Sequence, residues 1–188
     1  MQHTGTVTLE TERLILRRFT MEDAAAMYSG WASDAEVTRY LTWPPHADIG
    51  VTQALLADWT ARYAKKDWYQ WAIELKQLGQ PIGSIAVVDM QELAAKVHIG
   101  YCLSRAQWGR GIMTEALRAV IDHMFAVVEA ERVEARFDPR NIGSGRVMEK
   151  AGMKFEATLE RADWNNTGIC DATYYRILRS EWTPQPGE

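Results

Sequence analysis

Two spacings of apolar residues alternate along the chain and predict helices and strands in turn. Apolar side chains recur every three or four residues from Met113 to Phe125, the spacing of a helix that buries one face. Thr20, with Asp23 three residues later, is typical of a helix start, and Gly152 is placed to end a short helix. We expect helices over residues 20–33, 48–66 and 112–129, and a short one within 141–151.

Short runs rich in β-branched and aromatic residues, bounded by turn residues, predict strands. Two pairs of runs are separated by short glycine-containing turns, KQLGQ at 76–80 and NNTG at 165–168, which favours antiparallel hairpins. The strands are expected over residues 14–19, 69–75, 81–90, 95–103, 132–138, 154–164 and 171–182.

The order of these elements is strand, two helices, three strands, long helix, strand, short helix and two strands. This order, without a repeat or a linker, predicts a single α+β domain over residues 1–188. We expect its core over about 11–182, with flexible ends at 1–8 and 183–188.

Composition narrows the functional classes. The formal net charge of −4 argues against a nucleic-acid partner, and no apolar run has the length of a membrane span. The chain begins without the pattern of a secretory signal, and its 2 cysteines are expected to be free thiols, so we expect a cytoplasmic protein. The histidines lack metal-ligand spacing, and no metal site is expected.

A glycine-rich turn precedes the long helix. Gly109 and Gly111 lie two residues apart, and Arg105 and Arg110 add positive charge. The first amides of a helix have no partner within it, and glycines let several amides point toward one anion such as a pyrophosphate. The alternative is that the glycines only form a tight turn, because the pattern matches neither the dinucleotide fingerprint nor the phosphate loop of nucleotide hydrolases.

Further residues favour a ligand between two strands. Gly100 lies inside a predicted strand, where a glycine often marks a bulge or a close approach of backbone. Asn141 and Ser144 stand at the start of the short helix, directly after another strand. If these two strands lie side by side and splay, a ligand can enter the gap and pair with the exposed strand edges.

Four segments together resemble the GCN-type N-acetyltransferase (GNAT) superfamily, and more narrowly its RimJ/RimL-like branch of ribosomal-protein N-terminal acetyltransferases. They are TERLILRRFTMEDA, PIGSIAVV, IGYCLSRAQWGRGIMTEAL and NIGSGRVMEKAGM, and the resemblance covers about residues 11–182. It implies a GNAT fold, with a mixed and mostly antiparallel sheet of about seven strands, flanked by helices and splayed between its two central strands. It also implies acetyl-coenzyme A (acetyl-CoA) as cosubstrate.

The resemblance assigns the cosubstrate site residue by residue. The glycine turn corresponds to the segment that holds the pyrophosphate, and the strand ending at Leu103 to the one that pairs with the pantetheine arm. Ala106 stands where relatives carry Arg or Gln, which removes one side-chain contact and leaves the amides intact. The implied acetyl-CoA contacts are Tyr101, Leu103, Gln107, Trp108, Gly109, Arg110, Gly111, Ile112, Met113, Thr114, Asn141 and Ser144.

Acetyl transfer requires a neutral amine and a proton for the departing thiolate. By resemblance Ser144 lies near the thioester sulfur and gives that proton, although a serine here could also only cap the helix. Asp163 is the expected base, at a place where RimL-like enzymes carry Glu. It could instead act through a water, bind a cationic substrate or be only a solvated turn residue. Glu134 and Glu74 are the other candidates.

The acceptor is expected to be a primary amine, most simply a protein N-terminus, because an α-amino group needs less help from a base than lysine does. Attack is expected to be direct, in a ternary complex. A small-molecule amine acetyltransferase and a coenzyme A-binding module without activity are the alternatives. Trp43 and Trp164 could wall the acceptor site. We expect no nucleic-acid or membrane partner, and a monomer or homodimer.

Overall fold

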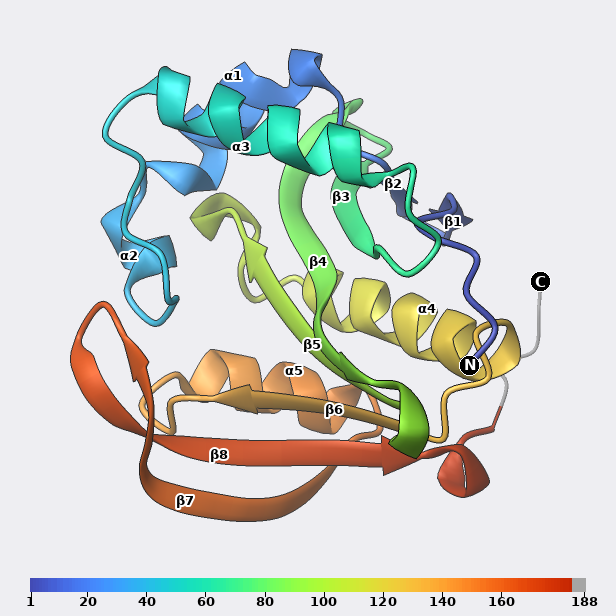
Figure 1. The fold of residues 1–188 in the computed structure, drawn as a ribbon. Helices are drawn as coiled ribbons and strands as arrows, with labels where there is room; N and C mark the ends of the chain where they lie inside the picture. Colours follow the sequence, from blue (N-terminus) through green and yellow to red (C-terminus); the bar gives the residue numbers. More distant parts are fainter. Residues whose placement is uncertain (184–188) are drawn as a thin grey trace.

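A mixed sheet forms the centre of the computed structural model, which describes residues 1–183 (Figure 1). The sheet has eight strands in the order β1-β2-β3-β4-β5-β6-β8-β7. All neighbours are antiparallel except β5 and β6, which are parallel. The strands are β1 (Leu9–Glu10), β2 (Leu14–Arg17), β3 (Gln70–Leu75), β4 (Gln80–Gln91), β5 (Lys96–Leu103), β6 (Arg132–Phe137), β7 (Lys154–Asn165) and β8 (Gly168–Leu178).

This arrangement confirms the α+β class and the mixed, mostly antiparallel sheet. The expected count of about seven strands was one short, because β1 is only 2 residues long and too brief for a periodic signal.

The helices are α1 (Ala24–Met27), α2 (Ala35–Thr38), α3 (Ile49–Arg62), α4 (Ile112–Ala126) and α5 (Ile142–Lys150). The helix expected over residues 20–33 is irregular: a 3₁₀ turn precedes α1 and a π-helical turn follows it. Its start is as expected, since the Thr20 amide donates to the Asp23 carboxylate over 2.8 Å. No helix among residues 1–183 has the length and apolar character needed to cross a membrane.

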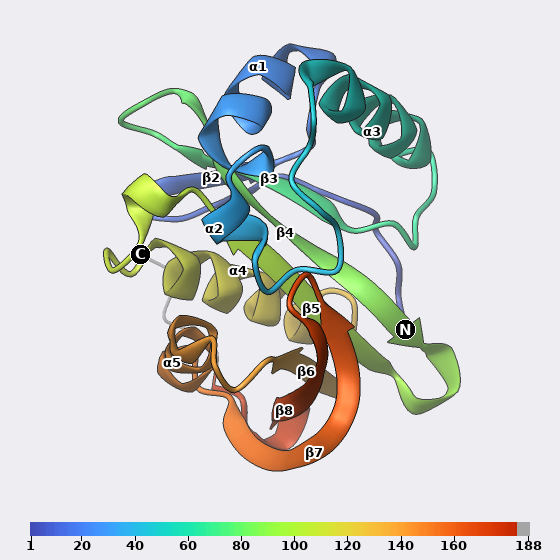
Figure 2. The same ribbon diagram turned by 90° about the vertical axis from the view of Figure 1, so that its left-hand side faces the viewer.

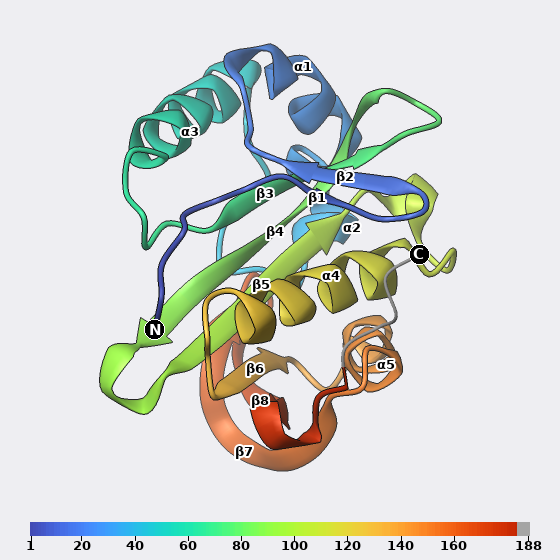
Figure 3. The ribbon, with the colours of Figure 1, turned by 90° about the vertical axis from the view of Figure 1, so that its right-hand side faces the viewer.

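Helices cover both faces of the sheet. Helix α4 lies on one face, whereas α1 and α3 lie together on the other (Figure 3). The apolar stripe of α4, including the fully buried Leu117 and Met124, packs against strand residues such as Ile85. On the opposite face, Trp31 and other residues of the first helical segments pack over Ala72. Each large side chain buried in this way contributes about 1.5–3 kcal/mol to stability.

The two central strands part from each other near the middle of the sheet. In the described residues, β5 and β6 pair at three positions, the last being His98 opposite Glu134. Beyond that point β5 continues beside β4 as far as Leu103, while β6 continues beside β8 as far as Phe137. The expected splay between the central strands is therefore present.

Gly100 lies in the splayed part of β5, opposite Ala86 of β4 and close to a β-bulge in that strand. The register between the two strands shifts between Val87 and Asp89, which turns Val88 over the glycine. A Cβ at position 100 would lie 2.9 Å from Cγ1 of Val88. This close approach is the kind of feature that a glycine inside a strand predicts.

The segment before β1 makes contacts that a flexible segment would not keep. The Gln2 amide donates to Val128 over 2.7 Å and the Gly5 amide to Lys66 over 2.6 Å, while Thr6 is buried. We expected residues 1–8 to be flexible. In the structure this segment packs against the ends of α3 and α4. The expectation that residues 183–188 are flexible concerns positions that, beyond Thr183, lie outside the described residues.

Candidate active site

The turn between β5 and α4 presents free backbone amides. Gly109 and Gly111 have φ angles of 74° and 75°, the left-handed conformation that favours glycine. Gly111 is the N-cap of α4, and no side chain caps this helix. Ile112, Met113 and Thr114, which follow Gly111, are buried, and the first amides of a helix have no partner within the helix. An uncapped helix start of this kind suits an anion.

Two side chains of the turn contact residues outside it. The Trp108 indole N–H donates to the carbonyl of Leu103 over 2.8 Å, which folds the turn onto the end of β5. Arg105 forms an ion pair with Asp34 at 3.1 Å, so its charge is partly engaged. Arg110 is exposed, with a long 3.4 Å contact to Gln107. It is the arginine of this turn that is placed to meet an anion.

Alternation along β5 assigns its side chains to two faces. Leu103 belongs to the core cluster around α4, and Tyr101 packs against that cluster. Cys102 packs against the cluster formed by the first helices, and its thiol lies 3.3 Å from the Ser84 hydroxyl. Burial raises the pKa of the Cys102 thiol, which keeps it from acting as a nucleophile.

Asn141 and Ser144 form the start of α5. The Asn141 side chain accepts from the Ser144 amide over 3.4 Å and acts as the N-cap of the helix. The Ser144 hydroxyl is not used for capping. It donates to the Tyr101 hydroxyl over 3.0 Å, and the Tyr101 hydroxyl donates to the Ser144 carbonyl over 3.1 Å. The two sides of the splay are thereby joined by one pair of residues.

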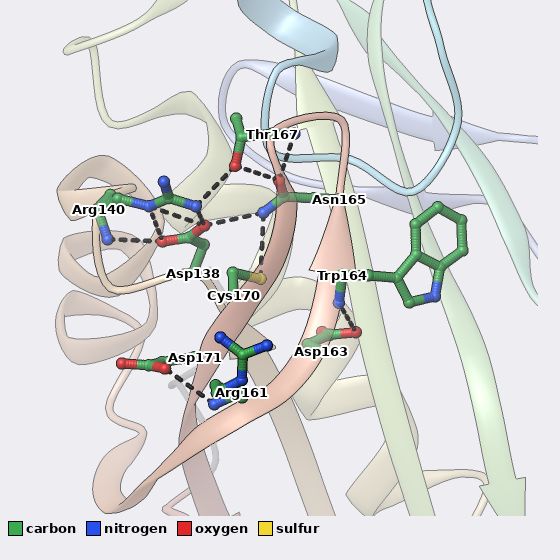
Figure 4. Close-up of polar contacts among 9 residues, drawn as sticks. All are labelled: Asp138, Arg140, Arg161, Asp163, Trp164, Asn165, Thr167, Cys170 and Asp171. Carbon is green, nitrogen blue, oxygen red and sulfur yellow. Dashed lines mark hydrogen bonds and ion pairs between the residues drawn. The ribbon is translucent and has the colours of Figure 1, made fainter.

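Asp163, the expected base, lies on β7 in contact with an arginine. Arg136 Nε lies 2.6 Å from one carboxylate oxygen of Asp163. The amide of Trp164 donates to the other oxygen over 2.9 Å, as Figure 4 shows. Trp164 itself is 57% exposed. An irregular register between Leu159 and Asp163 bends β7, so that Asp163 is presented at the end of the hairpin.

The alternative carboxylates are also engaged. Glu134 is buried on β6, where burial by itself would raise its pKa. Hydrogen bonds from Lys96, Arg132 and His98 outweigh that effect and lower the pKa of Glu134. Glu74 accepts a 2.6 Å hydrogen bond from Arg17. Each of the three carboxylates considered as a base therefore faces a cation.

A polar cluster with a buried aspartate at its centre joins the hairpin between β7 and β8 to the end of β6. Asp138, whose side chain is 1% exposed, pairs with Arg140 and accepts from the Asn165 amide group over 2.9 Å (Figure 4). Arg140 also donates to the Thr167 hydroxyl over 2.6 Å, and the Asn165 amide group contacts the Cys170 sulfur at 3.3 Å. We call these five residues the Asp138 cluster.

The turn of the same hairpin also contacts the loop between α2 and α3. The Asn166 amide group donates to the carbonyls of Thr38 and Trp43 over 2.8 and 2.7 Å, and its backbone N–H donates to Leu41 over 3.1 Å. Figure 2 shows this loop and the hairpin side by side. The contact brings the loop of Trp43 beside the hairpin of Trp164, two tryptophans distant in sequence.

Replacing Asp138 with Asn is expected to destabilise the protein by about 2 kcal/mol at pH 7. The hydrogen bonds from Arg140, with smaller contributions from Asn165, lower the pKa of Asp138 to about 2. An unfolded Asp titrates near ~3.9, so this stabilisation is complete above about pH 5 and is lost as the pH falls from about 4 to about 2. Urea unfolding of wild type and D138N across this range measures it.

The exposed pair of Asp58 with Arg62 on α3 provides the control for that measurement. D58N is expected to cost no more than about 0.5 kcal/mol at any pH. A stability difference for D138N that stayed constant from pH 7 to pH 2 would contradict the ionic origin of its effect.

Residues 13–154 match the family model described as "Acetyltransferase (GNAT) domain". The chain belongs to the GNAT family of acyl-CoA-dependent acetyltransferases. An uncharacterized N-acetyltransferase, p20 of Bacillus licheniformis, is 27% identical over 93% of this chain and 98% of its own length. The ribosomal-protein-serine acetyltransferase of Escherichia coli is 31% identical over 53% of this chain and 56% of its own length.

Solved structures agree with the fold. A structure described as RimL, the ribosomal L7/L12 alpha-N-protein acetyltransferase in complex with coenzyme A, superposes with a TM-score of 0.82. It is 18% identical and covers 92% of this chain and 98% of its own. A putative acetyltransferase from T. thermophilus is 28% identical, with a TM-score of 0.77 over 93% of this chain and 90% of its own. Relatives of this GNAT acetyltransferase thus include ribosomal-protein acetyltransferases, as the sequence motifs indicated.

Two features of the site were missed by reasoning from the sequence. The hydroxyl pair of Tyr101 and Ser144 joins positions 43 residues apart, and only the parting of β5 from β6 explains why they meet. The Asp138 cluster left a clearer signal, since the segment DPRN places Asp and Arg two residues apart directly after a strand. That spacing suits the local hydrogen bond from the Arg140 amide to Asp138, at 3.0 Å.

Proposed function

We propose that this acetyltransferase moves the acetyl group of acetyl-CoA to a primary amine, the α-amino group of a protein N-terminus, by direct attack in a ternary complex. The observation that carries the proposal is the uncapped start of α4, with Gly109 and Gly111 in left-handed conformation, directly beside the gap between β5 and β6.

On this proposal the cosubstrate lies on the face of α4 and α5. The amides from Gly109 to Thr114 hold the pyrophosphate, with Arg110 beside it. Beyond His98, the edge of β5 that faces β6 has no strand partner in the described residues, so its backbone groups are available to the amides of the pantetheine arm. Tyr101 and Leu103 line this edge, Gln107 and Trp108 close the turn, and Asn141 faces them from α5.

The acceptor is proposed to approach from the opposite face, through the hairpin and loop that carry Trp164 and Trp43. Gly100 has no side chain on this face of β5, and Val88 of β4 lies over it. The gap between the strands then joins the two faces, so that the thioester carbon meets the amine there. This arrangement supports direct transfer from cosubstrate to acceptor.

The reaction needs one proton to move from nitrogen to sulfur. The amine nitrogen forms a bond to the thioester carbon, the carbon–sulfur bond breaks, and its electron pair leaves with the sulfur. Ser144 is proposed to give the proton to that sulfur. The nitrogen loses one proton in the same turnover, and this proton returns to Ser144 through solvent, so that none is consumed.

The state of the candidate bases favours an α-amine. Asp163, Glu134 and Glu74 are each engaged in an ion pair with a cation, and the hydrogen bonds that Glu134 accepts lower its pKa. Asp163 remains the proposed contact for the incoming amine, because it lies on the bent hairpin beside Trp164. If no base in the site removes a proton from the amine, the amine must bind in its neutral form. About one third of α-amino groups are neutral at pH 7.5.

The names of the relatives support the same acceptor class. The Escherichia coli relative is a ribosomal-protein-serine acetyltransferase, and the RimL structure is that of an alpha-N-protein acetyltransferase. A thiol-release assay with acetyl-CoA tests the proposal against peptides that begin with Ser, Ala or Met, lysine peptides, polyamines and aminoglycosides. Release only with α-amines supports it; release only with polyamines or aminoglycosides contradicts the acceptor, and binding of acetyl-CoA without release contradicts the activity.

Ser144→Ala is expected to lower kcat by about 100-fold, the scale of a lost proton donor, and to leave the KM for acetyl-CoA within about twofold. The reason is that the hydroxyl acts when the thiolate leaves and not when the cosubstrate binds. The Asn141 cap of α5 is unchanged by this variant, so thermal unfolding should shift little. An unchanged kcat would show that Ser144 is only part of the helix start.

A further inference from the structure

The Tyr101 side chain makes two hydrogen bonds to one residue across the splay. Its hydroxyl accepts from the Ser144 hydroxyl at 3.0 Å and donates to the Ser144 carbonyl at 3.1 Å. Tyr101 stands on β5 beyond the last residue that pairs with β6, whereas Ser144 stands in the first turn of α5. Because it accepts one hydrogen bond and donates the other, the Tyr101 hydroxyl has a defined direction in this structure.

This contact supplies a group that the α5 segment itself lacks. The segment NIGSGRVMEKAGM contains no tyrosine. In this fold a tyrosine hydroxyl reaches the same helix turn from β5 instead. Its other neighbours are apolar, since Tyr101 packs against the core cluster around α4.

We propose that Tyr101 is a positioning residue for the transfer reaction, whose hydroxyl orients the Ser144 hydroxyl and stabilises it as the thiolate leaves. The inference rests on the proposed function. The two oxygens of Ser144 that contact Tyr101 are almost equally distant from it, at 3.0 and 3.1 Å. A rotation about the phenol C–O bond therefore moves the Tyr101 proton from the Ser144 carbonyl to the Ser144 hydroxyl oxygen.

The protons of Ser144 and Tyr101 can be followed through the transfer step. The Ser144 O–H bond breaks as its proton passes to the sulfur that leaves the thioester carbon, and the Tyr101 O–H then donates a hydrogen bond to the serine oxygen. The proton that the nitrogen loses returns to the serine oxygen through solvent, so Ser144 and Tyr101 are both protonated at the end of the turnover. Burial raises the pKa of Tyr101, with the hydrogen bond to Ser144 as a smaller opposing effect, so the phenol stays protonated at the pH of any assay near neutrality.

The test is a double-mutant cycle with Tyr101→Phe and Ser144→Ala, measured by thiol release with acetyl-CoA and an active amine. Y101F removes one oxygen and keeps the ring that packs in the core. We expect kcat to fall about tenfold, with the KM for acetyl-CoA within about twofold. In the S144A background Y101F should have no further effect on kcat, because the group that it positions is gone.

Two other variants separate positioning from packing. Tyr175→Phe is the matched control, because this ring also packs against the core around α4 and its hydroxyl has no hydrogen-bond partner among residues 1–183. It should leave kcat unchanged. Ser144→Thr keeps a hydroxyl, so Y101F should again cost about tenfold in that background.

The outcomes are distinct. A Y101F enzyme as active as wild type, or one equally impaired with and without Ser144, overturns the positioning role while the proposed function stands. A raised KM with unchanged kcat would show that Tyr101 only binds the cosubstrate. Wild type without turnover on any amine overturns the proposed function, and this inference with it.

Discussion

An α-amine is expected to be acetylated at least about 100 times faster at pH 7.5 than a lysine side chain in a peptide of the same sequence. An α-amino group titrates near ~7.8 and lysine near ~10.4, so about one third of the former and about 0.1% of the latter is neutral at this pH. The three candidate bases, Asp163, Glu74 and Glu134, are engaged in ion pairs, and on the proposed function none of them removes that difference. Peptides with one free amine each, assayed by thiol release, measure the ratio.

The pH profiles of the two peptides are the control. The rate with the α-amine should level off above about pH 8, whereas the rate with lysine should rise about tenfold per pH unit until about pH 10. Equal rates at pH 7.5, with a flat profile for lysine, would show that the enzyme has an efficient base. Asp163→Asn would then test whether Asp163 is that base, with Asp58→Asn, which changes an exposed carboxylate on α3, as the comparison.

Gly109→Glu is expected to weaken acetyl-CoA binding by about 100-fold or more. The substitution places a negative charge where the pyrophosphate is proposed to lie, and it forces a side chain into a left-handed conformation that costs about 1–2 kcal/mol. No heavy atom lies within 4 Å of a Cβ built at this position, so a clash within the protein does not contribute. Calorimetry with acetyl-CoA measures the affinity.

Gly152→Glu is the matched control for this loss. Gly152 follows α5 with a φ of 92°, and a Cβ there also meets nothing within 4 Å. The two variants share a left-handed backbone and the same added charge, and they differ in their distance from the start of α4. Equal affinities for acetyl-CoA in G109E and G152E would contradict a pyrophosphate site at the glycine turn.

The apolar spacing predicted most of the fold because the long elements bury one face each. The stripe of α4 and the alternation of β4 and β5 are strong local signals, and their positions agree with the structure within a few residues. The first helical segment was harder, because its π-helical turn, Tyr28–Ala32, obeys no single helical period. β1 is defined by its pairing with β2, which the sequence of β1 alone does not indicate.

In the candidate site, too, local features could be predicted from the sequence and contacts between distant segments could not. The glycine turn could be predicted, since a left-handed N-cap is a property of local sequence. Contacts between distant segments could not, because periodicity does not specify which charges meet. Asp163 is an acid in a turn when read along the chain, and only the structure places Arg136 2.6 Å from it.

The match to the family model ends at residue 154, where β7 begins. The glycine turn, both central strands and the start of α5 lie inside the matched residues, and the hairpin with Asp163 and Trp164 lies beyond them. The hairpin and the glycine turn lie on separate elements of the fold. A change of sequence in the hairpin can therefore alter the proposed acceptor side and leave the proposed acetyl-CoA side in place.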